Sequence, residues 1–384
     1  MTDLSTPVRA LLPGVGEPAA GLPALPGAVL AAADAERVRR TLDGSVSAAT
    51  RRAYASDWRS FSAWCAAKGY VALPAAPETV IAYLSEAAAT VRPDGTPAYA
   101  VSTLTRRAAA LNAAHASAGV PAPGAGGQVA RAALRAIRRE RTAAPRRVDP
   151  LLTDDLKLIL RSLATPAWPG AVAAARDAAV LLAGFAGAFR RSELAALNLS
   201  DVIPSRHDGV HLRVRRSKTD QEGAGLIKAL PFGHDPLTCA PCALYRWMDL
   251  LEAVDGDGGR VALMRAVRGS GDPGTHLCRR ERARTDSELP LFRSLAGGGA
   301  VKATRMSGHA VNEMLKRRAA AAGLDPTRYG GHSLRAGFVT QAFRAGADSR
   351  AIRRQTGHKS DTVLAVYDRE YAPLVGNAVT SIGL

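Results

Sequence analysis

The chain has 384 residues, of which 47% are hydrophobic, and a formal net charge of +17. These figures allow two ordinary domains, exclude disorder along the whole chain, and make nucleic acid the first partner to consider. Four cysteines are too few for a disulfide scaffold, and neither a membrane-spanning stretch nor a signal peptide is apparent, so we expect a cytoplasmic protein without membrane association.

The first part of the chain predicts a helical domain behind an N-terminal tail. Residues 1–42 are rich in Pro, Ala and Gly without a sustained period, which predicts a flexible tail. Aromatic residues then recur at intervals of three and four after the potential caps Ser47 and Thr50, as they do on an amphipathic helix. Further helices are predicted at 77–89, 101–118 and 129–141.

The helix predicted at 129–141 has a basic face. Four arginines fall within a sector of roughly 100°, and apolar residues take the opposite side; the four are Arg131, Arg135, Arg138 and Arg139. A solvated face is the ordinary interpretation of such charges, but four arginines without an interleaved Glu would repel one another. We therefore interpret the face as a contact to a phosphate backbone. Coding bias explains why 44 of the 51 basic residues are Arg, but not the excess of positive charge.

The second part of the chain predicts a larger domain of mixed structure. Residues 142–150 contain two prolines and no apolar face, which predicts a linker between domains at 43–141 and 151–384. Alternation at 210–214 and a returning segment at 226–231 predict two strands of a small sheet. The Gly- and charge-rich stretch 254–289 predicts a long surface loop or insertion. Helices are predicted at 154–163, 170–183, 190–197, 240–253, 308–321, 333–345, 349–355 and 361–371.

Side chains suited to phosphoryl chemistry occur in this second domain. His332 and Arg335 stand at positions i and i+3 of a predicted helix, so their side chains share a face. An arginine fork holds two phosphoryl oxygens, and a histidine moves a proton near neutral pH. The same spacing recurs at His276 and Arg279, so the surrounding sequence has to distinguish the two pairs.

Three further patches supply that context. Arg190 stands at a helix start, with Glu193 three residues on to orient it. Lys218, one of only seven lysines, lies near the hairpin turn, and an ammonium with a perturbed pKa can donate a proton that a guanidinium holds too tightly. His358 follows a glycine, and Tyr367 stands nine residues further on. Taken singly, each has an ordinary explanation as an ion pair, a solvated lysine or a packing tyrosine.

As an ordered set, these residues resemble the signature of the tyrosine recombinases, the phage integrase family: Arg190, Glu193, Lys218, His332, Arg335, His358 and Tyr367. The catalytic part of the resemblance spans about 150–384, and the basic helical domain before it resembles that family's core-binding domain. The resemblance implies a mainly α fold. It comprises a SAM-like helical core-binding domain and a mostly helical catalytic domain with a small antiparallel sheet.

The resemblance also implies a site-specific DNA recombinase or integrase that works through a 3′-phosphotyrosyl intermediate. Arg190 and Arg335 would hold the phosphate while Lys218 protonates the leaving 5′ oxygen. His332 would exchange the proton of the nucleophile Tyr367, and His358 would add a hydrogen bond to the phosphate. This scheme requires neither a metal nor a cofactor. The partners would be double-stranded DNA and a homo-oligomer, a tetramer in the synaptic complex, in which the segment 372–384 docks on a neighbouring protomer.

Several alternatives stay open at this point. Tyr371 is a rival nucleophile on the same predicted helix face, although the nine-residue interval after His358 favours Tyr367. Arg191 departs from the family, in which this place is usually apolar, and is a candidate DNA contact. A type IB topoisomerase would use a similar constellation, and a catalytically silent DNA-binding protein would share the fold.

A metal site is considered at Cys239 and Cys242. With His234 nearby, these two thiols make half of a zinc site, whereas a structural zinc normally has four protein ligands. Cys278 is the only other cysteine of the domain and lies in the stretch 254–289. We therefore expect no metal site and interpret the pair as partly buried thiols at a helix start.

Overall fold

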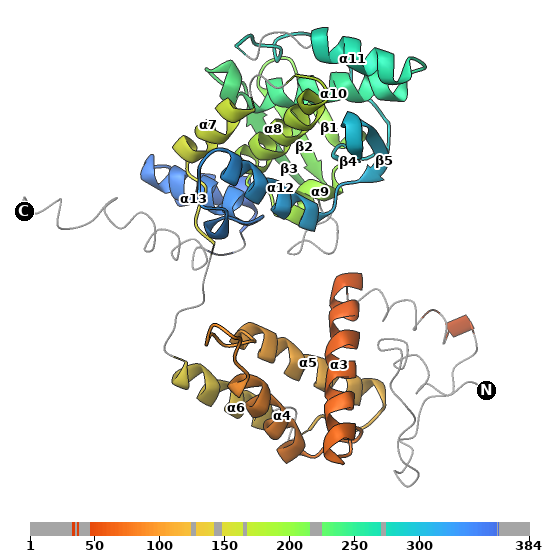
Figure 1. The fold of residues 1–384 in the computed structure, drawn as a ribbon, viewed down its shortest axis with the longest axis vertical. Helices are drawn as coiled ribbons and strands as arrows, with labels where there is room; N and C mark the ends of the chain where they lie inside the picture. Colours follow the sequence, from red (N-terminus) through yellow and green to blue (C-terminus); the bar gives the residue numbers. More distant parts are fainter. Residues whose placement is uncertain are drawn as a thin grey trace, which may run out of the picture. The chain divides into compact units, whose positions relative to one another are not determined.

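The computed structural model describes residues 33–34, 37, 47–123, 128–141, 148–163, 167–215, 225–269, 274–358 and 360. Nearly all of the tail predicted at 1–42, and the whole helix predicted at 361–371, lie outside the described residues. The chain forms two compact units, Met1–Arg146 and Arg147–Leu384, which are drawn in Figure 1. None of the described helices combines the length and the apolar character needed to cross a bilayer.

The first unit is helical around an aromatic core. Its helices include α3 (Ala48–Lys68), α4 (Pro77–Ala89), α5 (Val101–Ser117) and α6 (Gln128–Glu140). Ser47 caps α3, since its hydroxyl accepts a hydrogen bond from the backbone N of Thr50 at 3.2 Å. The aromatic spacing predicted for α3 is confirmed: Trp58 and Phe61 are buried, and the Phe61 ring lies 5.1 Å from that of Tyr83 on α4.

Arg141, the residue that follows α6, fastens this helix to its neighbours. Its guanidinium donates hydrogen bonds to the carbonyl of Tyr99 and, at 2.8 Å, to the carbonyl of Ala88 in the last turn of α4. The far end of the predicted linker belongs to the second unit, because the backbone N of Asp149 donates to the carbonyl of Arg328 at 2.8 Å. Residues 142–147 lie outside the described part.

The second unit is mostly helical. Helix α8 is buried on nearly every side and packs against α10 and α13, so it forms the centre of the unit. The helices are α7 (Thr153–Ser162), α8 (Gly170–Ala186), α9 (Arg191–Ala196), α10 (Ala240–Asp255), α11 (Gly259–Gly269), α12 (Gly308–Ala321), α13 (Ser333–Arg344) and α14 (Ser349–Thr356). Short 3-10 turns occur at Leu199–Asp201, Pro236–Thr238, Gly297–Gly299 and Pro326–Arg328.

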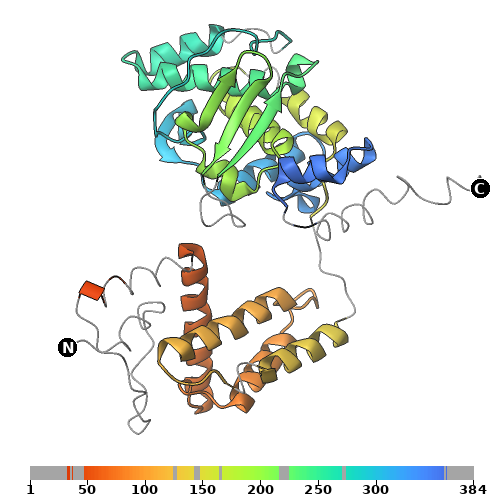
Figure 2. The same ribbon diagram turned by 180° about the vertical axis from the view of Figure 1, so that it is seen from behind.

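Two small antiparallel sheets complete this unit. The first has the order β1-β2-β3, and its strands are β1 (Val202–Ser205), β2 (Gly209–Val214) and β3 (Leu226–Pro231). Figure 2 shows these strands in front of the helices, and Val210, Leu212 and Leu230 contribute to the core between them. The second sheet pairs β4 (Arg293–Leu295) with β5 (Val301–Arg305). Sequence patterning did not predict β1, β4 and β5, which are too short for alternation to be recognised.

The stretch 254–289 contains a helix, so the prediction of a long surface loop there is wrong, whereas the alternative of an insertion stays a prediction. Residues 259–269 form α11, which buries only Leu263 and therefore has a weak apolar signature. The segment 274–289 then runs back along the unit, where Arg282 pairs with Asp249 on α10 at 2.6 Å. Further on, the Arg215 guanidinium pairs with Glu288 at 2.6 Å, and these hydrogen bonds lower the pKa of Glu288 to about 2.

Candidate active site

Arg190 is held in place at the start of α9. Its backbone N and its guanidinium both donate to the Glu193 carboxylate, the former at 3.0 Å. Glu193 is buried, with 3% of its side chain exposed, whereas the Arg190 side chain is 21% exposed. The predicted orienting pair is therefore present, and it holds a partly exposed guanidinium at the surface of the unit.

Arg335 enters the same region from α13 and is almost fully buried. Its Nη1 donates to the carbonyl of Ala188 at 2.7 Å, and its Nη2 lies 3.0 Å from Nε2 of His358. The helix reaches this position because Gly337 packs directly on the backbone of Leu151, where an added Cβ would stand 1.9 Å from the Leu151 carbonyl oxygen. Only a glycine permits so close an approach.

The turn between α8 and α9 supplies main-chain acceptors to the site. Ala188 has a φ of 46°, a left-handed conformation that side chains with a Cβ seldom adopt. Its carbonyl accepts from Arg335, and it also lies 3.3 Å from Nζ of Lys228. The strained peptide thus holds two cationic side chains beside Arg190.

Lys228 is a buried lysine that the sequence analysis did not single out. It lies on β3, 0% exposed, and Nζ donates to the carbonyls of Gly187 at 2.6 Å and of Gln355 at 2.8 Å. Burial lowers the pKa of Lys228 to about 7, against the Coulombic effect of Glu193. A signal was available: in the alternating strand, Lys228 occupies the face that also carries Leu226 and Leu230.

His358 completes the buried part of the site. It follows α14, which ends at Gly357 in the left-handed conformation with a φ of 70°. Burial, reinforced by the charges of Arg335 and Arg190, lowers the pKa of His358 to about 3, so the ring is neutral at physiological pH. Nε2 faces an arginine donor and must accept, so the hydrogen of the neutral ring is on Nδ1. This Nδ1 is buried and has no hydrogen-bond partner among the described residues.

His332 precedes α13 and is exposed, one helical turn before the buried Arg335. Its charge adds to the burial and the arginine charges that lower the pKa of His358. Arg191 is exposed as well, and its side chain packs on Gly331, directly before His332. Lys218, Tyr367 and the rival Tyr371 lie outside the described residues.

The basic face predicted on the last helix of the first unit is present on α6. Ala130, Leu134 and Ile137 are buried in the core of the unit. Their opposite side carries four exposed arginines, none of which forms an ion pair with any residue that the structure describes: Arg131, Arg135, Arg138 and Arg139. Among the described residues, nothing neutralises the charge of this face.

The second unit thus gathers three cationic side chains, Arg190, Arg335 and Lys228, around a neutral histidine. The charges of all three act on His358. Guanidinium forks and an imidazole N–H are donors that match the oxygens of a phosphate. The arrangement is suited to binding a phosphodiester and stabilising negative charge that develops on it.

Comparisons with known proteins agree with this chemistry. The Phage integrase family model matches residues 273–372. The integrase/recombinase xerD homolog of Selenomonas ruminantium is 32% identical over 334 residues, covering 86% of this chain and 84% of that protein. The tyrosine recombinase XerD of Xanthomonas axonopodis pv. citri (strain 306) is 34% identical over 85 residues, covering 22% of this chain and 26% of that protein.

A solved structure shares the fold. The XerH site-specific recombinase, described as bound to a palindromic difH substrate in a post-cleavage complex, superposes with a TM-score of 0.54. It is 14% identical, and the match covers 89% of this chain and 83% of that one. The mainly α fold with small antiparallel sheets is thus confirmed. Because one relative is more than 30% identical over most of both chains, the chain belongs to the phage integrase family of tyrosine recombinases, the site-specific enzymes that break and rejoin DNA.

Proposed function

We propose that this recombinase cleaves each DNA strand with Tyr367 as nucleophile. The Oη of Tyr367 attacks the scissile phosphorus, a new P–O bond forms, and the bond to the 5′ oxygen breaks. The tyrosine proton passes to His332, and Lys218 gives a proton to the leaving 5′ oxygen. The products are a 3′-phosphotyrosyl link and a free 5′ hydroxyl, and the reverse reaction with a new 5′ hydroxyl joins the exchanged strand.

The cationic cluster carries this proposal. Arg190 and Arg335 offer guanidinium forks to the non-bridging oxygens, which gain charge in the transition state. His358 presents a buried N–H that has no other acceptor among the described residues, so a phosphate oxygen would satisfy it. Lys228 adds positive potential from the buried interior of the site, where its Nζ contacts three carbonyl oxygens.

The first unit would hold the duplex. In this proposal residues 43–141 form a core-binding domain, the segment 142–150 links it to the catalytic domain at 151–384, and the two domains clamp double-stranded DNA in the cytoplasm. The exposed arginine face of α6 contacts the phosphate backbone, and Arg191 adds a contact next to the active site. Paired sites are joined in a homotetramer, with 372–384 docking on the neighbouring protomer. The neighbours with known activity are recombinases, which disfavours a topoisomerase or a silent DNA-binding protein.

A covalent-trapping experiment tests the chemistry. The protein is expressed in cells that carry candidate target DNA, covalent complexes are recovered under denaturing conditions, and the attached DNA is sequenced. A nicked suicide substrate built from the recovered site then allows covalent complex formation to be followed in vitro. We expect the wild type and Tyr371→Phe to become linked to the 3′ phosphate, and Tyr367→Phe to bind the same duplex without forming the link.

Two outcomes would overturn the assignment. If Tyr371→Phe abolishes the link and Tyr367→Phe does not, the nucleophile is Tyr371. If neither the wild type nor any variant becomes linked while duplex binding persists, the protein is a binding module. A strand-exchange assay on two marked sites separates recombination from relaxation of a single duplex.

A further inference from the structure

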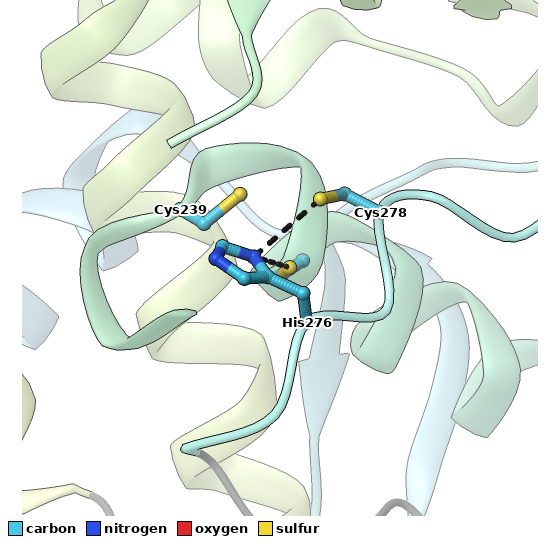
Figure 3. Close-up of side chains that lie close together, drawn as sticks. Cys239, His276 and Cys278 are labelled. Atoms are coloured by element: carbon cyan, nitrogen blue, oxygen red, sulfur yellow. Dashed lines mark hydrogen bonds between the residues drawn. The ribbon is translucent and has the colours of Figure 1, made fainter. Parts of the chain in front are cut away.

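Three cysteines and a histidine meet at one end of α10, away from the residues assigned to cleavage. Cys239 precedes the helix and Cys242 lies in its first turn, whereas His276 and Cys278 belong to the segment that follows α11. Their ligand atoms, three Sγ and one imidazole nitrogen, all lie within 4.8 Å of one another. Figure 3 shows the His276 ring pointing into the space between the sulfur atoms.

The separations match a tetrahedral metal site. His276 Nδ1 lies 3.3 Å from Sγ of Cys242 and 3.6 Å from Sγ of Cys278. In a tetrahedron with zinc–sulfur bonds of about 2.3 Å and zinc–nitrogen bonds of about 2.0–2.1 Å, neighbouring ligand atoms stand about 3.6–3.8 Å apart. The four side chains need only small adjustments to reach this geometry. The cysteines are free thiols, so disulfides do not explain why they converge.

Hydrogen bonds around the cluster orient the ligands. His276 Nε2 lies 3.1 Å from the carbonyl oxygen of His234, which accepts its hydrogen and leaves a lone pair on Nδ1 directed at the thiols. The backbone N of Gly233 donates to Sγ of Cys239 at 3.3 Å, and that of Leu277 donates to Sγ of Cys242 at 3.2 Å. Donors of this kind stabilise thiolates, the form in which cysteine binds a metal.

The three thiols are buried in a cluster separate from the main core, and the His276 side chain covers them from the exposed side. Cys239 and Cys242 are 0% exposed and Cys278 is 3% exposed, and the one further apolar side chain packed on them is Phe232 among the described residues. Three of the four cysteines in the sequence therefore meet in one place. Four protein ligands without an open position are typical of a structural site.

We propose that Cys239, Cys242, His276 and Cys278 bind one structural zinc ion. From the sequence, Cys239 and Cys242 with His234 nearby made only half of a four-ligand site, and Cys278 lay in the stretch 254–289, so no metal was expected. In the structure the histidine of the cluster is His276, and the carbonyl oxygen of His234 accepts a hydrogen bond from its ring. The ion ties the segment 274–289 to the start of α10, just beyond the end of β3.

Metal content of the full-length, untagged protein tests this assignment. After expression in zinc-supplemented medium and dialysis against a weak chelator, we expect one zinc per chain by elemental analysis. His276→Ala and Cys278→Ser should lose the metal, with affinity lowered at least tenfold. His234→Ala keeps the carbonyl acceptor, and Cys65→Ser alters the cysteine outside the cluster, so both should retain one zinc.

A second measurement guards against variants that fail to fold. The wild type, stripped of metal and reloaded with Co²⁺, should show the thiolate charge-transfer and d–d absorption bands of a tetrahedral site, and X-ray absorption of the zinc form should show three sulfur neighbours and one nitrogen. The assignment is overturned by a wild type that holds no zinc or holds iron, by a disulfide within the cluster in the native protein, or by zinc retained in His276→Ala. Covalent DNA cleavage is assayed separately, so its failure leaves this result unaffected.

Discussion

The Nη2 of Arg335 lies 3.0 Å from Nε2 of His358, so a guanidinium and an imidazole are in direct contact. The same guanidinium donates to the carbonyl of Ala188 through Nη1. Burial, reinforced by the charge of Arg335, lowers the pKa of His358 and keeps the ring neutral, and the guanidinium donor at Nε2 leaves the hydrogen on Nδ1. In the proposed mechanism the pair presents a preorganised set of donors to one phosphate, which is the condition for electrostatic catalysis.

Replacing Arg335 with lysine should separate charge from geometry. Lys keeps the positive charge but cannot span both Ala188 and His358, and it has no planar fork for two oxygens. We expect single-turnover covalent complex formation on a suicide substrate to fall by about 10²–10³-fold, the usual effect of removing one transition-state donor. Duplex affinity should change little.

The control for this variant is Arg344→Lys, at the exposed far end of the same helix. It should cleave DNA at the wild-type rate. Thermal melts of both variants show whether the second domain remains folded. Near wild-type cleavage by a folded Arg335→Lys would mean that Arg335 only supports the turn at Ala188.

Lys228 should give the protein a pH-dependent stability. Burial lowers its pKa to about 7 in the folded state, whereas an unfolded chain has the ordinary value of 10.5. Between these values the unfolded state binds more protons, so the free energy of unfolding should rise with pH, by up to about 1.4 kcal/mol per pH unit. Below pH 7 this lysine contributes no slope, since it is charged in both states.

Urea unfolding between pH 6.5 and pH 9.5, at intervals of about half a pH unit, measures this slope. Lys228→Met should remove the rise above pH 7, and Lys302→Met, which alters an exposed lysine on β5, should keep it. The same slope in wild type and Lys228→Met would contradict a lowered pKa for this group.

The arginine face of α6 should govern the salt dependence of DNA binding. Each phosphate contact contributes about 0.9 to the slope of log K against log salt concentration. Arg135→Ala combined with Arg138→Ala should weaken binding and reduce the slope by up to about 1.8 if each contacts one phosphate. Arg92→Ala is the matched control, because that guanidinium already donates to the carbonyls of Pro97 and Ala98. If the double variant keeps the wild-type salt slope, the arginine face of α6 does not contact DNA and is a solvated surface.

Gly337→Ala should destabilise the second domain through a steric clash. The new Cβ would stand 1.9 Å from the carbonyl oxygen of Leu151, a contact that requires backbone movement. We expect a loss of about 1–3 kcal/mol in the free energy of unfolding, as overpacking usually causes. Gly269→Ala, where nothing lies within 4 Å of the added atom, should be nearly neutral. Equal stability of the two variants would refute the close approach of α13.

Local patterns predicted the geometry of two residue pairs in the candidate site. The intervals between Arg190 and Glu193, and between His332 and Arg335, lie within one helical turn, so sequence spacing largely determines their geometry. Local sequence also determines the bounds of α4 and α12, which follow from proline, glycine and the apolar periodicity. Such features depend on short-range interactions that a single sequence records.

Features built by tertiary contacts escaped prediction. Lys228 became part of the site because three carbonyl oxygens, at 187, 188 and 355, converge on its Nζ from other elements. Likewise, His276 stands 34 residues after Cys242 in the sequence, yet their ligand atoms are 3.3 Å apart. No spacing rule brings these groups together, since the intervening α11 and the return of the chain along α10 determine the distance.

The turn at Gly187 and Ala188 has a consequence for engineering this enzyme. Its carbonyl oxygens hold Arg335 and Lys228, and its backbone restricts the side chains at both positions. A Cβ added at Gly187 would stand 2.2 Å from the Phe189 ring, and Ala188 already has a φ of 46°. Larger side chains at Gly187 or Ala188 should therefore shift the backbone and weaken both anchors. Inserting or deleting one residue between Gly184 and Arg190 would displace both anchors at once. Both the small size of these residues and the length of the turn are therefore constraints on any redesigned variant.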